Sequence, residues 1–220
     1  MTNKFSVKPD GLFRQNIVLM SGLVTAPIIV AATTVERAIV LVLSFFLMSY
    51  TSIMICRIVP RKIVYTVRAM LYAVVAAGMF IPTVIILEML FPATTKSVML
   101  YIEILTVNSL LLAKTESRFY LEPYGVMALD ALFYVIGYAI AAFVVGAIRE
   151  LLAYGTLFGL RWFDPPMPAA KSPFFGFFLI GIFAAVCRAG CGMRRAQQRG
   201  QRAARASQSI APDSRGEGAQ

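Results

Sequence analysis

The chain contains no histidine and only three cysteines among its 220 residues. Without histidine it lacks the commonest protein ligand for transition metals and the usual base of a catalytic serine or cysteine. Cys56, Cys187 and Cys191 form no disulfide framework. Cys187 and Cys191 lie one helical turn apart, but no third metal ligand lies near them in the sequence, so we interpret them as ordinary thiols.

Charged residues are also scarce, at 15% of the chain, whereas a soluble domain carries about 25%. Hydrophobic residues make up 59%, and the mean hydropathy is +0.73. This composition predicts an all-α integral membrane protein with no soluble domain of useful size. The basic residues behind the net charge of +10 lie in short loops and in the C-terminal tail, which indicates membrane topology rather than nucleic-acid binding.

Six apolar segments follow one another along the chain. About 20 apolar residues are needed to cross a hydrocarbon layer of ~30 Å, and the first, fourth and sixth segments are short for this. Residues 23–37 align without a gap over residues 104–118 and share threonine, alanine, threonine and arginine at matching positions. We therefore predict six transmembrane helices as two inverted three-helix repeats, with short or broken first and fourth helices. The expected spans are residues 17–32, 38–56, 67–91, 98–113, 126–148 and 174–187.

The distribution of basic residues predicts the topology. With the N-terminus inside, most lysines and arginines fall in inner segments, so we expect both termini in the cytoplasm and the protein in a bacterial inner membrane. Residues 1–16 form the expected N-terminal segment, and 17–191 the membrane domain, with repeats of about 17–92 and 98–191. Residues 192–220 have one isoleucine and no aromatic residue, which predicts a flexible basic tail. We expect it to be solvated near anionic lipid; a docking arm for a partner is the alternative.

Acidic residues at membrane depth are the first candidates for function, because an ionised carboxylate there costs about 2.5–3.5 kcal/mol. Glu103 lies within the expected fourth span and Glu88 near the end of the third. Glu103 fits a cation or proton site or a contact with another subunit, and equally a carboxylate that reaches water in a gap between half-helices. Glu88 lies close enough to the interface that we expect it to be solvated.

Small polar residues in the short spans form a second candidate set. Broken backbone is tolerated in a membrane only where it lines a cavity or a protein interface. These residues fit such breaks, although ordinary hydrogen bonding between helices explains them at least as well. With one proline added, the set comprises Thr25, Pro27, Thr106, Asn108 and Ser109.

Charged residues also flank the expected fifth span. Asp130 lies at its start, where it could cap or line the cytoplasmic entrance, and Arg149 and Glu150 follow its end. We expect Arg149 and Glu150 to reach water and to form an ion pair within the helix or between subunits. Trp162 fits an interfacial aromatic belt.

Two stretches carry a resemblance to a known family. Residues 128–158 contain ALD, GAIRE and GTLF, and residues 106–116 read TVNSLLLAKTE. They resemble the paired six-helix membrane subunits of Rnf and Na⁺-translocating NADH:quinone oxidoreductase complexes, most closely the RnfE/NqrD type. The resemblance implies a partner of the RnfA/NqrE type inserted in the opposite orientation. It also implies one [2Fe–2S] cluster held between the two subunits by four cysteines.

The chain departs from this family at the cluster positions. Val24, or another residue within Val24–Ala26 if the proline is shifted in the alignment, and Ser109 stand where the family has cysteine, and none of these side chains supplies a thiolate. We therefore expect no cofactor on this chain and expect flavin and Fe–S centres on partner subunits. The predicted function is a membrane subunit of an Rnf/Nqr-like ion-translocating complex, whose candidate ion-path or intersubunit residues are Thr25, Glu88, Glu103, Thr106, Asn108 and Ser109. The alternative is a stand-alone transporter for an ion or a small molecule.

Overall fold

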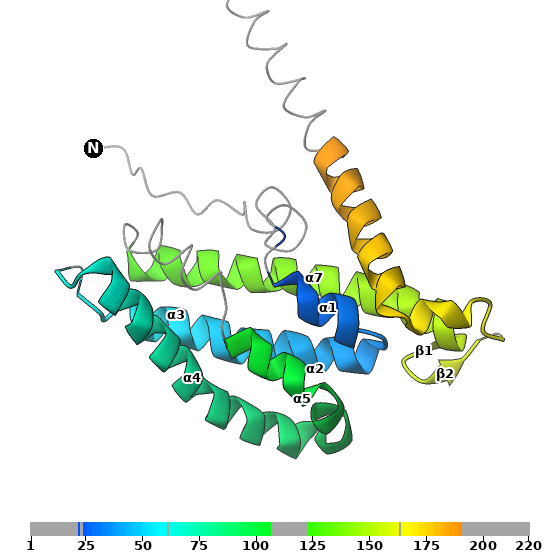
Figure 1. The fold of residues 1–220 in the computed structure, drawn as a ribbon, viewed down its shortest axis with the longest axis horizontal. Helices are drawn as coiled ribbons and strands as arrows, with labels where there is room; N and C mark the ends of the chain where they lie inside the picture. The colour runs from blue at the N-terminus through cyan, green and yellow to red at the C-terminus, as the bar shows by residue number, and fades with distance from the viewer. Residues whose placement is uncertain (1–21, 23, 61, 107–122, 163, 191–220) are drawn as a thin grey trace, which may run out of the picture.

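The computed structural model describes residue 22 and residues 24–60, 62–106, 123–162 and 164–190. Within these residues four helices are long and apolar enough to cross a membrane. They are Val35–Cys56, Tyr65–Leu90, Tyr124–Tyr154 and Pro173–Gly190. Two shorter helices, α1 (Thr25–Ala31) and α5 (Pro92–Thr106), pack among them (Figure 1). The described residues therefore form a helical fold whose long helices suit a membrane, as the composition predicts.

The first long helix is built from three consecutive pieces. They are α2 (Val35–Phe45), a π-helical turn η2 (Phe46–Tyr50) and α3 (Thr51–Cys56). Hydroxyl groups compete with amide groups for backbone carbonyls at both ends of the π turn. Ser44 Oγ donates to the carbonyl oxygen of Val40 at 2.6 Å, and Thr51 Oγ1 donates to that of Leu47. A π turn of this kind accommodates one extra residue in a helix and is frequent at functional sites.

The next helices form a hairpin. In α4 (Tyr65–Leu90), Pro82 removes one backbone donor, and the helix curves in Figure 1. The hydroxyl of Thr83 donates to the carbonyl oxygen of Met79 at 2.7 Å. At the turn into α5, Thr95 Oγ1 donates to the carbonyl oxygen of Leu87 at 3.1 Å and satisfies the end of α4. The two helices pack along each other as a hairpin.

The longest helix, α7 (Tyr124–Tyr154), ends at Gly155, whose φ of 66° is readily adopted by glycine. An antiparallel hairpin of β1 (Thr156–Leu157) and β2 (Leu160–Arg161) follows, and then a 3₁₀ helix, η4 (Pro168–Lys171). We call the end of the bundle formed by residues 155–172 the hairpin end. From there the C-terminal helix, Pro173–Gly190, diverges from the bundle in Figure 1.

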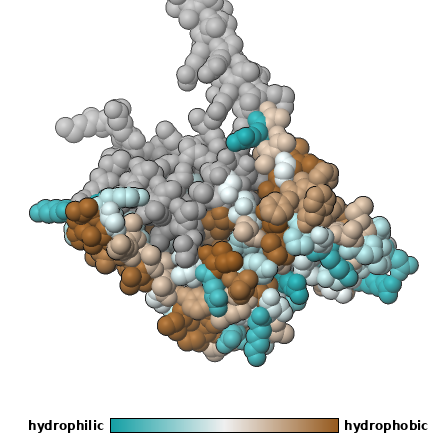
Figure 2. Space-filling view, viewed as in Figure 1, coloured by the Kyte–Doolittle hydropathy of each residue, from teal (hydrophilic) through white to brown (hydrophobic). Residues whose placement is uncertain are grey.

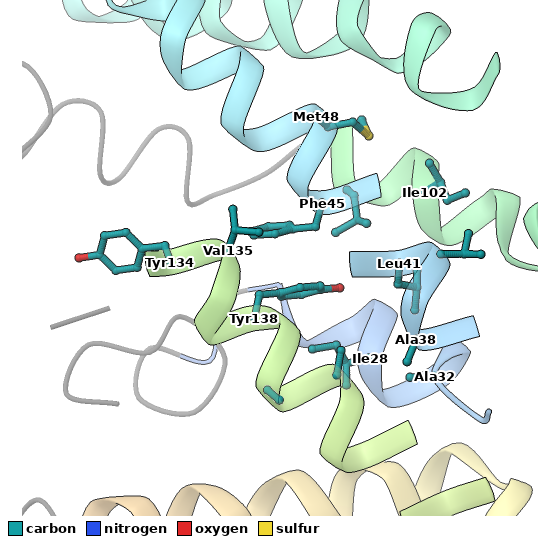
Figure 3. Packing of buried hydrophobic residues seen from close by; sticks show 14 of the residues in the cluster. Ile28, Ala32, Ala38, Leu41, Phe45, Met48, Ile102, Tyr134, Val135 and Tyr138 are labelled. Atoms are coloured by element: carbon teal, nitrogen blue, oxygen red, sulfur yellow. The ribbon is translucent and has the colours of Figure 1, made fainter. Parts of the chain in front are cut away.

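The core lies where α2, α5 and α7 meet around α1. Figure 3 shows the rings of Phe45 and Tyr138 stacked at its centre, with centroids 4.1 Å apart. By contrast, α4 and the C-terminal helix keep most of their apolar side chains exposed, and brown apolar patches cover much of the surface in Figure 2. A soluble protein rarely exposes so much apolar surface, whereas lipid tails or a partner helix accommodate it.

The observed helices correspond to the expected spans with shifted bounds. The second, third, fifth and sixth spans are the four long helices, each extended at one or both ends. The first expected span contributes α1, and the fourth contributes α5 as far as Thr106. Residues 107–122, which hold the rest of the fourth span, lie outside the described residues, as do residues 1–21 and 191–220. The pairing of halves as inverted repeats stays a prediction.

Candidate functional site

A turn with left-handed backbone conformation at Gly22 and Val24 precedes α1, and we call it the break. Gly22 has a φ of 66° and Val24, directly before the helix, has a φ of 59°. The left-handed region is unfavourable for a β-branched residue, so Val24 is held in a strained conformation. The hydroxyl of Thr25 donates to the carbonyl oxygen of Gly22 at 3.4 Å across this turn. The helix that follows, α1, has only seven residues and spans about 10 Å, a third of the hydrocarbon layer.

Arg149, near the end of α7, is fully buried and binds the other end of α1. Its Nη1 donates to the carbonyl oxygens of Ile29 at 2.6 Å and Ala32 at 3.4 Å. Its Nε and Nη2 donate to three carbonyl oxygens of η4 and the residue that follows: Ala170 at 3.1 Å, Lys171 at 2.9 Å and Ser172 at 3.3 Å. The guanidinium thus neutralises the carbonyl-rich ends of two short helices.

Glu150 is the next residue along the chain, and it is 3% exposed. Its Oε2 accepts from the amide of Val35, the first residue of α2, at 2.7 Å. Its Oε1 accepts from Thr156 Oγ1 at 3.2 Å and from the amide of Gly159 at 3.1 Å in the β hairpin. The carboxylate therefore complements the amide-rich start of α2.

Together, Arg149 and Glu150 form a pair that we call the clasp. The positive member holds the end of α1, the negative member holds the start of α2, and the two helices are joined only by residues 32–34. The expectation that both side chains reach water was wrong, because both are buried and bind groups of α1, α2, the β hairpin and η4. No ion pair between them is recorded among the described residues, and each is satisfied separately.

Three buried residues with polar side chains, Asp130 and Tyr138 on α7 and Ser52 on α3, form a set that we call the polar strip. Asp130 is 1% exposed, so it is buried inside the bundle. The hydroxyls of Ser52 and Tyr138 are buried and have no hydrogen-bond partner among the described residues. Figure 3 shows the Tyr138 hydroxyl directed toward Leu41 on α2.

The antiparallel alignment of α7 with the α2–η2–α3 helix places Asp130 and Ser52 at about the same height along the bundle. A Cβ at Gly146 would lie 3.0 Å from that of Ala38, and Phe45 stacks on Tyr138, so α2 and α7 run antiparallel. Two further turns along both helices lead from the stacked rings to Ser52 and the Asp130 turn. This register is set by packing, and a buried acid in a spanning helix is a functional candidate.

The acids that the sequence placed first lie elsewhere. Glu103 on α5 and Glu88 on α4 are both exposed on the surface of the bundle, while Thr25 and Thr106 are half-buried near the ends of α1 and α5. Glu103 lies about 17 Å along the helix from Pro92, the first residue of α5. Asn108 and Ser109 lie outside the described residues.

The described cysteines do not lie at the break. Cys56 is buried at the end of α3, and Cys187 is half-buried in the C-terminal helix; Cys191 lies outside the described residues. Val24 offers no donor atom where the family's cysteine is expected. Among the described residues no three His, Cys, Asp or Glu side chains gather as a metal site. The residues around α1 therefore do not fit thiolate ligation of an Fe–S cluster.

Comparison with known proteins gives a consistent result. Residues 5–184 match the family described as "Rnf-Nqr subunit, membrane protein". The chain is 25% identical over 165 residues to the D subunit of the Na⁺-translocating NADH-quinone reductase of Pseudoalteromonas translucida, and the match covers 71% of this chain and 78% of the relative. It is 26% identical over 149 residues to the E subunit of the ion-translocating oxidoreductase complex of Edwardsiella ictaluri. That match covers 68% of this chain and 63% of the relative, so it spans less than two thirds of the Edwardsiella protein.

Proposed function

The chain belongs to the Rnf-Nqr family of membrane subunits, and from this premise we propose that it is a membrane subunit of an ion-translocating oxidoreductase complex. The observation that carries the proposal is the match over residues 5–184, with relatives named as the D subunit of one such complex and the E subunit of another. The names of these relatives fit a subunit of the RnfE/NqrD type. The four long apolar helices agree with a membrane location, which we propose to be the bacterial inner membrane with both termini cytoplasmic.

The chain's own residues support a structural and ion-conducting role rather than an electron-carrying one. At the break before α1, Val24 presents a hydrocarbon side chain, which cannot bind iron. The described cysteines belong to other parts of the bundle. We therefore propose that the flavin and Fe–S centres of the complex lie on partner subunits.

A partner subunit of the RnfA/NqrE type, in the opposite orientation, is the natural neighbour for the surface that carries Glu88 and Glu103. Both carboxylates are exposed on the bundle, and lipid cannot solvate an ionised Glu103 within the membrane. A neighbouring helix with a basic or hydrogen-bonding side chain would satisfy it. Exposed Leu100 and Ile104 flank Glu103 on the same face of α5 and would supply apolar contact area around the charge.

Inside the bundle, the polar strip is the candidate segment of an ion path. Asp130 contributes a carboxylate, and Ser52 and Tyr138 contribute hydroxyl groups. Neither hydroxyl has a hydrogen-bond partner among the described residues, so each could bind an ion or a water molecule. The π turn η2 lies between the levels of Tyr138 and Asp130 on the facing helix. Oxygen ligands of this kind suit Na⁺ or a relayed proton.

The test of the proposed function is gentle purification of the tagged chain from its native membrane, with identification of the accompanying proteins and with visible and EPR spectra. Rnf- or Nqr-like subunits with flavin and Fe–S signals are expected, and an unrelated tagged membrane protein from the same cells is the control. Replacing Cys56, Cys187 and Cys191 with serine should leave the Fe–S signal unchanged. A colourless chain with no partner would overturn the proposal and favour the stand-alone transporter, which ligand-dependent thermal stabilisation of the purified chain would then test.

A further inference from the structure

We propose that Arg149 and Glu150 are positioning residues for the short helix α1. By tying α1 to the hairpin end of the bundle, they fix where α1 and the break at Gly22 and Val24 lie along the bundle. Each residue joins segments that are distant in the chain. Arg149 connects α7 to α1 and η4, and Glu150 connects α7 to α2 and the β hairpin. The C-terminal end of α1, opposite to the break, is therefore held in place.

The arrangement around Arg149 is specific to a guanidinium. Five backbone carbonyl oxygens from two segments lie between 2.6 and 3.4 Å from its Nε, Nη1 and Nη2. The planar group directs donors to both segments at once, whereas a lysine ammonium is a single point of charge with three donors. The carbonyl oxygens thus form a cage for a buried cation that is tethered to α7.

Close packing against the same carbonyl oxygen completes the hold. A Cβ added at Gly176 of the C-terminal helix would lie 2.4 Å from the carbonyl oxygen of Ile29, which is also the nearest acceptor for Arg149. The end of α1 is therefore contacted both by a guanidinium and by a helix backbone. With this end fixed, the seven residues of α1 place the break about 10 Å away along the helix.

The hairpin end and the break are thus coupled mechanically. A displacement of residues 168–172 would move the guanidinium, and the guanidinium would move the end of α1. The consequence for ion transport rests on the proposed function, and it assumes in addition that the break adjoins the ion path. The coupling itself follows from the contacts of the clasp and can be measured on the full-length chain alone.

The experiment measures the position of α1 directly. In a full-length chain whose three cysteines are replaced with serine, spin labels are attached at Ala26→Cys on α1 and Leu129→Cys on α7, both of which are exposed. The distance between them is recorded by double electron–electron resonance in lipid nanodiscs. We expect one narrow distance in the parent, loss of that narrow distance in Arg149→Ala, and its recovery when millimolar guanidinium is added to this variant.

The matched variants separate positioning from general stability. Arg149→Lys keeps the charge but not the fork of donors, so we expect a broad distance that guanidinium does not restore. Glu150→Gln should broaden the distance less and should also be insensitive to guanidinium. The same additive on the parent chain controls for denaturation. A narrow parental distance in Arg149→Ala or Arg149→Lys would overturn the proposal.

A failure of Arg149→Ala to fold also distinguishes the two possibilities. If Arg149→Ala does not fold unless guanidinium is present during purification, the cage needs its cation and the proposal is supported. If Arg149→Ala fails with and without guanidinium, Arg149→Lys decides: a parental distance overturns the proposal, and a broad one supports it. In the native complex, a lower ratio of ions moved to electrons transferred in Arg149→Lys, with unchanged subunit composition, would extend the effect to transport.

Discussion

Gly176 and Ile29 approach each other so closely that a methyl group added at the glycine would lie 2.4 Å from the isoleucine's carbonyl oxygen. Real Cβ atoms do not come this near to backbone atoms, and the backbone of α1 cannot swing aside as a flexible side chain can. The same oxygen accepts from Arg149 Nη1 at 2.6 Å. The glycine is therefore required by the contact between the C-terminal helix and α1.

Gly176→Ala should consequently lower the stability of the chain by about 1–3 kcal/mol, the usual range for overpacking. Gly181→Ala, in the same helix with nothing within 4 Å of the added methyl group, is the matched control. It should be neutral or stabilising by about 0.5–1 kcal/mol, because alanine favours helix. Thermal unfolding in one detergent compares the two variants. Equal melting temperatures would show that the C-terminal helix does not rest on α1.

A milder result is expected at the contact between α7 and α2. A Cβ at Gly146 would lie 3.0 Å from the Cβ of Ala38 and 3.3 Å from the carbonyl oxygen of Thr34. Small shifts of α2 can relieve such distances in part, so Gly146→Ala should cost about 1 kcal/mol, at the low end of the overpacking range. The ranking of melting temperatures should be Gly181→Ala above Gly146→Ala above Gly176→Ala. A Gly146→Ala variant that melts below Gly176→Ala would contradict this order.

The strain at Val24 predicts that glycine gives a more stable protein than alanine at this position, the reverse of their order inside a helix. With a φ of 59°, Val24 occupies a region that costs a side chain about 1–2 kcal/mol and costs glycine almost nothing. Val24→Gly should therefore be more stable than Val24→Ala by about 1 kcal/mol. At Ala26, inside α1, Ala26→Gly should instead be destabilising by about 0.5–1 kcal/mol. Unfolding midpoints of these three variants and the parent test the prediction; alanine preferred at both sites would refute a left-handed Val24.

Hydropathy alone was sufficient to predict the long helices, because a run of about twenty apolar residues has few stable environments other than lipid. The bounds were less accurate. The fifth span was expected to stop at residue 148, yet α7 continues to Tyr154 because Arg149 and Glu150 find partners without reaching water. A pair of charges after an apolar run ordinarily marks an interface, and nothing in the local pattern distinguishes the two cases.

The contacts of the clasp with α1 and α2 could not be predicted because these partners are backbone groups far away in the chain. Val35 is 115 residues from Glu150, and Ile29 is 120 residues from Arg149. Carbonyl and amide groups leave no signature in the sequence. The hairpin did leave one, since Gly155 precedes β1 and Gly159 lies in the turn between β1 and β2, and both have positive φ. Asp130 was noticed, but its burial depends on the register of α7 against α2.

The hydroxyl of Tyr138 gives a prediction about the interior. It is buried without a hydrogen-bond partner among the described residues, which usually costs about 1–3 kcal/mol. Tyr138→Phe keeps the stacking on Phe45, so the variant should be as stable as the parent or more stable by about 1 kcal/mol. Phe45→Tyr, which adds a hydroxyl to the same pair, is the comparison and should be destabilising. Marked loss of stability in Tyr138→Phe would show that the hydroxyl binds a group such as water or an ion.

Asp130 and Glu103 should differ in how their loss affects the native complex. Asparagine and glutamine match the two acids in size but carry no charge. Asp130 is buried inside the chain, so Asp130→Asn should leave the subunit composition unchanged while most ion transport is lost. Glu103 is exposed on α5, so Glu103→Gln should weaken the association with the neighbouring subunit, by about 2–5 kcal/mol where it leaves a buried partner charge unpaired. Purified complexes reconstituted in vesicles report both quantities, through the yield of partner subunits and the ions moved per electron. If Glu103→Gln assembles fully but loses transport, Glu103 belongs to the ion path rather than to the interface. If Asp130→Asn transports normally, the strip between α2 and α7 is a packing feature, and the path lies elsewhere.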